Sequence, residues 1–386
     1  MPVPMRVKRI SPFLVMDVLE RAQQLEREGR RIIHLEIGEP DMETPQCVRD
    51  ACARALAEGR THYTHSLGIP ELREAICDHF KQRYSVDVHP DRVLVTSGTS
   101  PAMFMVFSAL LQEGDTAAVS DPCYACYHNF IEFTGAGALR IPTNEEDGFQ
   151  FRAEEIQKRM DERTKAVMVN SPSNPTGVVL DPQNMRRIAE LGLHVVSDEI
   201  YHGLVYEGRE RSMLEFTDDC FVLNGFSKLY AMTGFRLGYL IMPERFVRPL
   251  QCMAQNFFIS ANTMAQWAGV AALREAGPDA ERMRNIYNER RLVLLKGLER
   301  IGLPAKSRPT GAFYVLVNAS HLDPNSQRLA FDILENAGVA VTPGVDFGPG
   351  GEGCLRFSYA NSVENIEEGL DRLGVYLERW EKPLTA

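Results

Sequence analysis

Short apolar runs alternate with amphipathic stretches along the middle of the chain. Six of these runs are predicted to be buried strands: RVLVTSG, TAAVSDP, AVMVNSP, HVVSDEI, CFVLNGF and LGYLIMP. The stretches between them place apolar residues at a helical period. Strands that alternate with helices in this way predict a mostly parallel sheet that helices cover on both faces.

Two helices have a well-defined apolar face. Residues 12–28 and 70–84 each repeat apolar residues every three or four positions, and Gly29 marks the end of the first helix. The apolar positions are Val15, Leu19, Ala22 and Leu25 in the first helix, and Leu72, Ile76 and Phe80 in the second. Three pairs of a capping residue and a proline predict helix starts, namely Ser11-Pro12, Thr44-Pro45 and Ser100-Pro101.

The pattern changes near residue 275, where a long charged helix is followed by mixed strands and helices. A chain of 386 residues accommodates about two domains. We therefore predict an α/β protein with a large sheet domain and a smaller α+β domain. The expected division is an N-terminal arm and part of the small domain over 1–45, the large domain over 46–274 and the small domain over 275–386.

Composition and charge argue against binding to nucleic acids or membranes and indicate the cellular compartment. A net charge of -10 argues against a nucleic-acid or anionic-membrane surface, since both need basic patches. No apolar run approaches the roughly 20 residues of a membrane span, and no signal peptide is recognisable. Eight scattered cysteines suit free thiols in a reducing cytoplasm. We therefore expect a cytoplasmic protein.

Two short motifs are better explained without a metal or a dinucleotide. Cys123 and Cys126 have C-x-x-C spacing, but no second pair supplies the four ligands of a zinc site, so we expect no metal. GPGGEG at 348–353 fits G-x-G-x-x-G, yet a predicted strand follows it where the dinucleotide motif needs a helix.

Polar residues follow the predicted strands at the point where each strand ends, which is where open sheets of this kind bind ligands. Gly98, Thr99 and Ser100 form a small-residue turn into a helix, whose free amides can bind a phosphate. The other polar residues at strand ends are Asn174, Asp198, Tyr201, Ser227, Lys228 and Arg236. Each of them has an ordinary structural explanation, as a cap, a turn residue or a solvated cation. Their convergence on one edge of one sheet favours a site.

This set of groups matches one ligand. It offers an anion site for a phosphate, an acid for a ring nitrogen, donors for a ring oxygen and an amine for a carbonyl carbon. Pyridoxal 5′-phosphate has all four partners, so we predict it as the cofactor.

The motifs that carry these residues also resemble a known family. SNPTG, DEIY and SKLYAMTGFRLGY occur in the order and spacing of class I/II aminotransferases of fold type I. The resemblance extends from LEIGEPDMETP near residue 35 to LRFSYA near residue 355. The ordered set of motifs is far more specific than any one of them.

The resemblance implies a role for each cofactor-binding residue. Lys228 would bond covalently to the cofactor aldehyde, and Asp198 would pair with the ring nitrogen. Tyr201 and Asn174 would bind the ring oxygen, and Tyr124 would stack on the ring. Residues that would hold the phosphate are Gly98, Thr99, Ser100, Ser227 and Arg236, with Tyr63 reaching it from the neighbouring subunit of a homodimer.

The resemblance also implies how the substrate is held. Arg356 lies in an apolar predicted strand, where a guanidinium is costly unless it is paired. It would bind the substrate α-carboxylate through two parallel hydrogen bonds, with help from Asn174 and the backbone at Gly38. The expected reaction moves an amino group between an L-amino acid and a 2-oxo acid.

The choice of substrate stays open at this point. Many aspartate-using relatives carry a lysine where Ser100 stands, which leaves alanine, branched-chain or aromatic donors possible. Two other functions remain. A carbon–sulfur β-lyase or γ-eliminating synthase would use the same residues, and product analysis would separate it from an aminotransferase. A non-catalytic sensing module is usually fused to a DNA-binding domain, for which this chain has little room.

Overall fold

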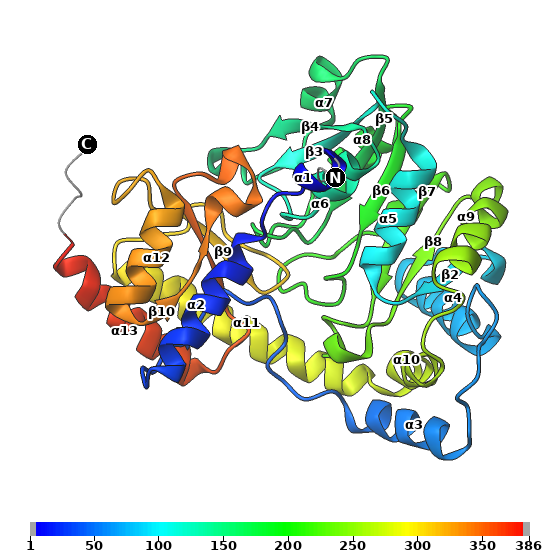
Figure 1. Cartoon of the computed structure of the whole chain (residues 1–386), viewed down its shortest axis with the longest axis horizontal. Helices are drawn as coiled ribbons and strands as arrows, with labels where there is room; N and C mark the ends of the chain where they lie inside the picture. The colour runs from blue at the N-terminus through cyan, green and yellow to red at the C-terminus, as the bar shows by residue number, and fades with distance from the viewer. Residues whose placement is uncertain (1–4, 381–386) are drawn as a thin grey trace.

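A seven-stranded sheet forms the centre of the larger part of the molecule (Figure 1). The computed structural model describes residues 5–380. The strand order is β2-β8-β7-β6-β5-β3-β4, and only β8 runs antiparallel to its neighbours. The strands are β2 Val93–Thr96, β3 Thr116–Asp121, β4 Gly137–Pro142, β5 Thr164–Asn170, β6 His194–Asp198, β7 Cys220–Gly225 and β8 Gly238–Ile241. The six predicted strands are confirmed, and β4 was missed.

The strands of this sheet are buried on both faces because alternate side chains enter two separate cores. In β7, Val222 belongs to one core while Phe221 and Leu223 belong to the other. In β2, Leu94 likewise points away from its two valine neighbours. Burial on both faces explains why the strands are continuous apolar runs rather than alternating ones.

Helices cover both faces of the sheet, as predicted. One core includes side chains of α4 Pro70–Tyr84, α7 Ala153–Arg159, α8 Pro182–Ala189 and α10 Thr263–Glu275, with α3 Gln46–Ala57 packed on α10. The other core includes side chains of α5 Thr99–Leu110, α6 Tyr127–Phe133 and α9 Glu244–Phe257. The predicted helix over 70–84 is α4, and its Leu72, Ile76 and Phe80 are buried.

A second, smaller set of strands lies at the other end of the molecule, coloured mostly orange to red in Figure 1, with the N-terminal β1 in blue. Strands β9 Tyr314–Asn318, β11 Thr342–Pro343 and β12 Cys354–Ser358 form an antiparallel sheet in the order β11-β12-β9, and β1 Ile33–His34 pairs with β10 Val339–Ala340. The helices here are α2 Leu14–Arg27, α11 Gly277–Arg300, α12 Ser326–Ala337 and α13 Val363–Glu378, and α1 is Met5–Lys8. The core of this end also includes Tyr201, Leu204 and Ala231, and the expected division at 45/46 and 274/275 stays a prediction.

The three predicted helix starts are each displaced from the expected capping residue. Helix α2 begins at Leu14, three residues beyond Ser11. Pro45 itself caps α3, while the Thr44 hydroxyl donates to the Ala231 carbonyl at 2.5 Å. Helix α5 begins one residue before Ser100, with Gly98 as its N-cap at a φ of 90°.

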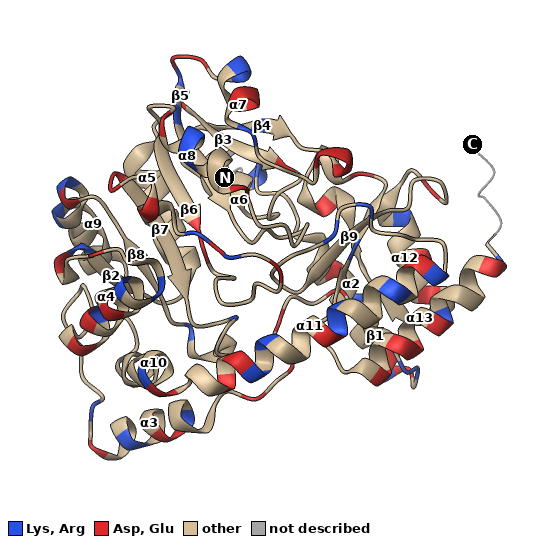
Figure 2. Cartoon of the chain, turned by 180° about the vertical axis from the view of Figure 1, so that it is seen from behind, with Lys and Arg blue, Asp and Glu red and all other residues tan. Residues whose placement is uncertain are grey.

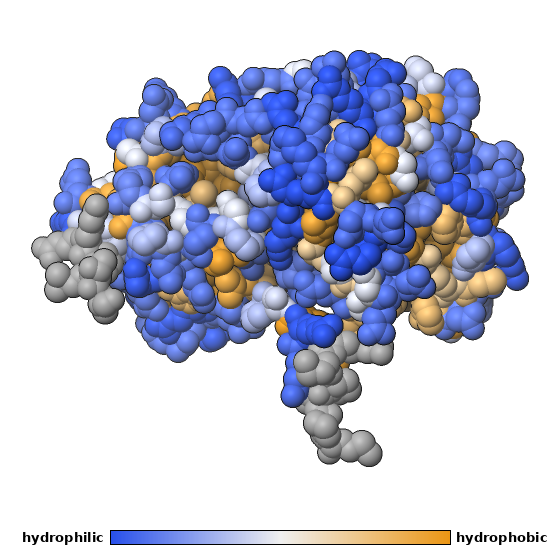
Figure 3. Space-filling view, turned by 90° about the horizontal axis from the view of Figure 1, so that it is seen from above, coloured by the Kyte–Doolittle hydropathy of each residue, from blue (hydrophilic) through white to orange (hydrophobic). Residues whose placement is uncertain are grey.

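The surface carries both charge signs, and Figure 2 shows Lys and Arg mixed with Asp and Glu along α11 and α13. The face seen in Figure 3 is mostly hydrophilic, with smaller hydrophobic groups between. Among residues 5–380, no helix is both long and apolar enough to cross a membrane.

Candidate active site

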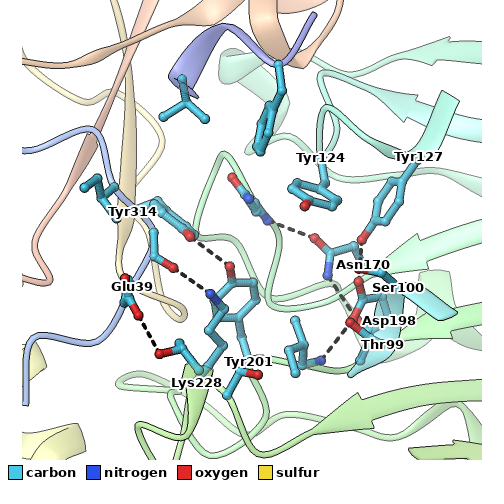
Figure 4. A pocket seen from close by; sticks show the side chains of 18 of the residues that line it. Glu39, Thr99, Ser100, Tyr124, Tyr127, Asn170, Asp198, Tyr201, Lys228 and Tyr314 are labelled. Carbon is cyan, nitrogen blue, oxygen red and sulfur yellow. Dashed lines mark hydrogen bonds between the residues drawn. The ribbon is translucent and has the colours of Figure 1, made fainter. Parts of the chain in front are cut away.

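A cavity opens at the carboxyl ends of the large sheet, on the side that faces the smaller part of the molecule. Asn170 ends β5, Asp198 ends β6, and Lys228 follows β7, so one edge of the sheet brings all three together. Figure 4 shows their side chains pointing into one space, with Tyr314 entering from the smaller part. Most of the predicted site residues line this cavity: Gly38, Thr99, Ser100, Tyr124, Asn174, Asp198, Tyr201, Ser227, Lys228, Arg236 and Arg356.

The Lys228 ammonium lies inside this cavity. It donates to the carbonyl of Gly38 at 2.5 Å, which links the large sheet to the N-terminal segment. The pKa of Lys228 is lowered to about 8, chiefly by burial; the cationic Arg356 and Arg236 also lower it, while Glu39 raises it. A substantial fraction of Lys228 is therefore a neutral amine near physiological pH, which is the form that attacks carbonyl carbons.

Asp198 is a buried carboxylate that accepts hydrogen bonds from two protein donors. Tyr127 donates its hydroxyl proton to Oδ2 at 2.8 Å, and the amide of Ile200 donates to Oδ1 at 3.1 Å. Burial raises the pKa of Asp198 to about 6, and these two hydrogen bonds oppose the rise. Asp198 can thus stay ionised at neutral pH and bind a cationic N–H group.

Two tyrosines stand side by side opposite Asp198. The hydroxyls of Tyr201 and Tyr314 share a hydrogen bond at 2.9 Å, and burial raises the pKa of both phenols. Tyr124 lies on another wall, with its ring centroid 5.3 Å from that of Tyr127. Neutral phenols of this kind can donate hydrogen bonds to a ligand oxygen.

The turn between β2 and α5 forms a tight cradle beside a guanidinium. A Cβ built on Gly98 would lie 2.7 Å from Nη2 of Arg236, and one on Gly238 would lie 2.8 Å from the carbonyl carbon of Gly98. Only glycine fits this approach at the φ of 90°. The amides of the first turn of α5 are therefore next to a cation, which is the arrangement that binds a phosphate.

Arg356 on β12 is held rigidly, but by neutral partners. Its Nη1 donates to Oδ1 of Asn174 at 2.9 Å, and its Nη2 donates to the Glu36 carbonyl and to Oγ1 of Thr342. The Tyr314 ring centroid lies 4.3 Å from its Cζ. Its buried Nε has no hydrogen-bond partner, and no carboxylate of residues 5–380 forms an ion pair with it. A ligand carboxylate would satisfy this guanidinium.

Sequence reasoning missed several residues that support the site. Tyr127 and Tyr314 come next to Asp198 and Tyr201 only through the fold, because they lie 71 and 113 positions away from them. Asn170 donates to the Asp198 carbonyl at 3.0 Å and accepts from the Asn174 amide at 2.9 Å. The AVMVN run could have indicated Asn170, since it is the last residue of a buried strand.

Tyr63 is the predicted cofactor residue that lies away from the cavity of its own chain. Its side chain is 81% exposed. The segment that carries it is held against α9 and α10, where Thr263 donates to the His62 carbonyl at 2.7 Å. Tyr63 is therefore not among the residues that line the cavity of its own chain.

The donor set fits pyridoxal 5′-phosphate. The glycine cradle with Arg236 suits a phosphate, buried Asp198 suits a protonated ring nitrogen, and the low-pKa amine of Lys228 suits an aldehyde. The partly unsatisfied Arg356 suits the carboxylate of a second molecule. Among residues 5–380, no group of three or more His, Cys, Asp and Glu could hold a metal ion.

Comparison with known proteins agrees with this geometry. The family model described as aminotransferase class I and II matches residues 30–373. The (5-formylfuran-3-yl)methyl phosphate transaminase of Methanocaldococcus jannaschii is 40% identical, over 97% of this chain and 99% of that protein. The aspartate/prephenate aminotransferase of Thermus thermophilus is 39% identical, over 97% and 98% of the two chains. The valine–pyruvate aminotransferase of Mycobacterium tuberculosis is 36% identical, over 95% and 97%.

Solved structures give the same result. The aspartate aminotransferase of Thermus thermophilus with maleate superposes with a TM-score of 0.93 at 38% identity, over 97% of this chain and 99% of that one. An aminotransferase from Mycobacterium tuberculosis gives a TM-score of 0.93 at 36% identity, over 98% and 100% of the chains. The similarity covers both parts of the molecule.

Proposed function

The chain belongs to the aminotransferase class I and II family and is an aminotransferase, and we propose that it works with pyridoxal 5′-phosphate bound at Lys228. The observation that carries the proposal is the meeting of Lys228, Asp198 and Arg356 in one cavity. The named relatives are aminotransferases, which supports amino transfer over the β-lyase and sensing alternatives.

The residues of this chain divide the work between binding and proton transfer. When bound, the cofactor supplies a ring that accepts the electron pair left on the donor α-carbon. Asp198 would keep the ring nitrogen protonated, and Gly98, Thr99, Ser100, Ser227 and Arg236 would hold the phosphate. Tyr201 and Asn174 would orient the ring oxygen while Tyr124 covers the ring face.

Substrate binding and proton movement fall to two cationic residues. Arg356 would hold the α-carboxylate of the amino acid and then of the 2-oxo acid, which places the α-carbon near Lys228. The Lys228 amine, with a pKa near 8, would take the α-proton as a base and return it as an acid. One group with a pKa near the working pH can perform both transfers.

We further propose that the preferred donors are neutral amino acids with apolar or aromatic side chains. Among the side chains that the structure describes, three cations line the cavity, and each already has a role: Lys228, Arg236 and Arg356. The remaining lining is rich in apolar side chains, among them Val15, Ile37 and Met103. A second carboxylate would be buried there without a partner, which costs several kcal/mol. The relatives are named for different substrates, from aspartate/prephenate to valine–pyruvate, and so do not indicate the donor class. The proposal therefore rests on the cavity of this chain.

The test is a donor panel on the purified holoenzyme, with the released 2-oxo acid identified by chromatography. Leucine, methionine and phenylalanine should be used at least about 100-fold better in kcat/KM than aspartate, because an unpaired buried carboxylate costs at least about 2.7 kcal/mol. If aspartate were the fastest donor, the proposed donor class would be wrong, while the assignment as an aminotransferase would stand. Release of ammonia and a thiol from cystathionine, with no amino transfer to any 2-oxo acid, would overturn the function.

Replacing Tyr127 by phenylalanine should shift the acidic limb of the pH profile. The lost hydrogen bond holds the pKa of Asp198 down, so that pKa rises in the variant. A hydrogen bond to a charged group is worth about 1.5–3 kcal/mol, which corresponds to about 1 to 2 pH units. Activity of Tyr127→Phe should therefore be lost at a higher pH as the solution is acidified. An unchanged limb in kcat/KM against pH would show that Tyr127 does not tune Asp198.

A homodimer in the cytoplasm completes the proposal. Exposed aromatic and aliphatic side chains at Tyr63, Phe257, Phe258 and Ile259 offer an apolar surface for a second copy. Tyr63 would then reach the phosphate site of the partner. All eight cysteines are free thiols, in keeping with a reducing compartment. A monomer mass in sedimentation equilibrium at micromolar protein would contradict the dimer.

A further inference from the structure

The first turn of helix α2 is capped by a carboxylate from the far end of the chain. The amide of Leu14 donates to Oδ1 of Asp346 at 2.8 Å, and the amide of Val15 donates to Oδ2 at 3.3 Å. The preceding residue, Phe13, offers no side-chain cap. Asp346 is 6% exposed, so its two oxygens are committed to this helix end. The start of α2 is thus stabilised by a residue that lies 332 positions further along the chain.

The capped end of α2 is a wall of the active-site cavity. Apolar side chains of this end line it, namely Phe13, Val15, Met16 and Leu19. The Phe13 ring stands edge-on to the ring of Tyr124, with centroids 6.0 Å apart. In Figure 4 the blue segment at the top directs its side chains toward the catalytic residues below.

The short helix η5, Gly344–Phe347, places Asp346 by contacts on several sides. The amide of Val345 donates to Oγ of Ser326 at 3.1 Å, and the carbonyl of Phe347 accepts from the Cys123 amide at 3.0 Å. Cys123 directly precedes Tyr124. The Phe347 ring centroid also lies 4.9 Å from Cζ of Arg356. One turn of backbone therefore connects the α2 wall, the Tyr124 wall and the substrate arginine.

We propose that Asp346 is a positioning residue for substrate selection, which holds the apolar wall of α2 at a fixed distance from Arg356. The inference rests on the proposed function, because it assumes that the donor α-carboxylate binds Arg356. A donor anchored there extends its side chain from a fixed point, so the placement of the wall decides which side chains are bound. An apolar donor gains more affinity if the wall is already in place before the donor binds, because binding then does not have to order the wall.

A purely structural cap would behave differently. It would change the stability or the overall activity of the enzyme for every donor alike. A positioning cap changes the binding of large apolar side chains and leaves a donor with only a methyl group nearly unaffected, because alanine has little apolar surface to bury. The ratio of two donors measured on one preparation separates the two roles, since this ratio does not depend on the folded fraction.

The experiment compares leucine with alanine as donors for Asp346→Ala, Asp346→Asn and wild-type holoenzyme. In Asp346→Ala, KM for leucine should rise roughly 3- to 30-fold, the equivalent of a lost helix cap, with kcat little changed. KM for alanine should change less than about 2-fold. Asp346→Asn keeps one side-chain carbonyl as an acceptor and should recover part of the loss. Glu20→Ala, an exposed residue beyond the first turn of the same helix, is the matched control and should match wild type.

Two results would overturn the proposal. One is an unchanged leucine-to-alanine ratio in Asp346→Ala, and the other is an equal loss for both donors. Failure of the proposed function would look different, because wild-type enzyme would then form no 2-oxo acid from either donor. If aspartate proves the best wild-type donor, only the donor class fails, and the leucine-to-alanine ratio still tests the wall.

Discussion

Lys228→Ala should lose amino transfer by at least about 10⁴-fold while still binding pyridoxal 5′-phosphate. The variant lacks both the amine that bonds to the cofactor and the base that moves the α-proton, and a positioned base alone is worth about 10²–10⁴. The Gly98 turn, Arg236 and Asp198 remain in place to hold the cofactor. Steady-state 2-oxo acid formation and equilibrium dialysis of the cofactor measure the two effects separately.

Two further variants locate the cause of this loss. Lys228→Arg keeps the charge but cannot release its proton near neutral pH, so it should be as inactive as the alanine variant. Lys165→Ala removes an exposed lysine that donates to the Glu162 carbonyl and should keep nearly full activity. Turnover of Lys228→Ala within 10-fold of wild type, an order-of-magnitude limit well inside the expected loss, would disprove the role of Lys228.

Arg356→Lys should lower kcat/KM about 10²- to 10³-fold for every amino-acid donor. A lysine cannot make the two parallel hydrogen bonds of a guanidinium, and it would leave Asn174 Oδ1 and Thr342 Oγ1 differently paired. Breaking a buried charge pair costs about 3–5 kcal/mol. We expect that replacing Arg356 by lysine loses most of this binding free energy, although the positive charge is kept. The measurement is kcat/KM for alanine, leucine and phenylalanine on one preparation.

The donor dependence separates Arg356 from Asp346. Loss at Arg356 should be the same for all three donors because each carries the same α-carboxylate, whereas loss at Asp346 should grow with the side chain. Arg328→Lys is the control, since this arginine pairs with Asp323 away from the cavity and is 56% exposed in its side chain. If Arg356→Lys affected only large donors, Arg356 would belong to the side-chain wall rather than to the carboxylate site.

Much of the fold and of the candidate site could be predicted from local pattern. Continuous apolar runs indicated six strands of the large sheet because strands buried on both faces need apolar side chains at every position. Polar residues directly after those runs indicated the cavity edge, since the carboxyl ends of parallel strands meet there. Asp198 and Lys228 follow β6 and β7 in sequence and lie together in space for this reason.

Contacts between distant segments were beyond local pattern. Tyr127 was not identified from the sequence, yet its hydroxyl donates to Asp198. The start of α2 was predicted at Ser11-Pro12 from capping preference, and it moved to Leu14 because Asp346 supplies acceptors to its first two amides. Ser11 instead donates its own amide to Asn129 at 3.0 Å. A capping residue is recognisable in sequence only when it is a neighbour of the helix that it caps.

The sequence by itself therefore determined which chemistry the protein carries: the amine, the acid and the phosphate turn are set by residue type after predicted strands, and the guanidinium by an arginine within one. Only the tertiary structure decided how these groups are tuned and what they select. Burial gives Lys228 a pKa of about 8, and the packing of η5 against α2 sets the apolar wall opposite Arg356. Desolvation and long-range packing depend on the whole fold, and no local pattern encodes them.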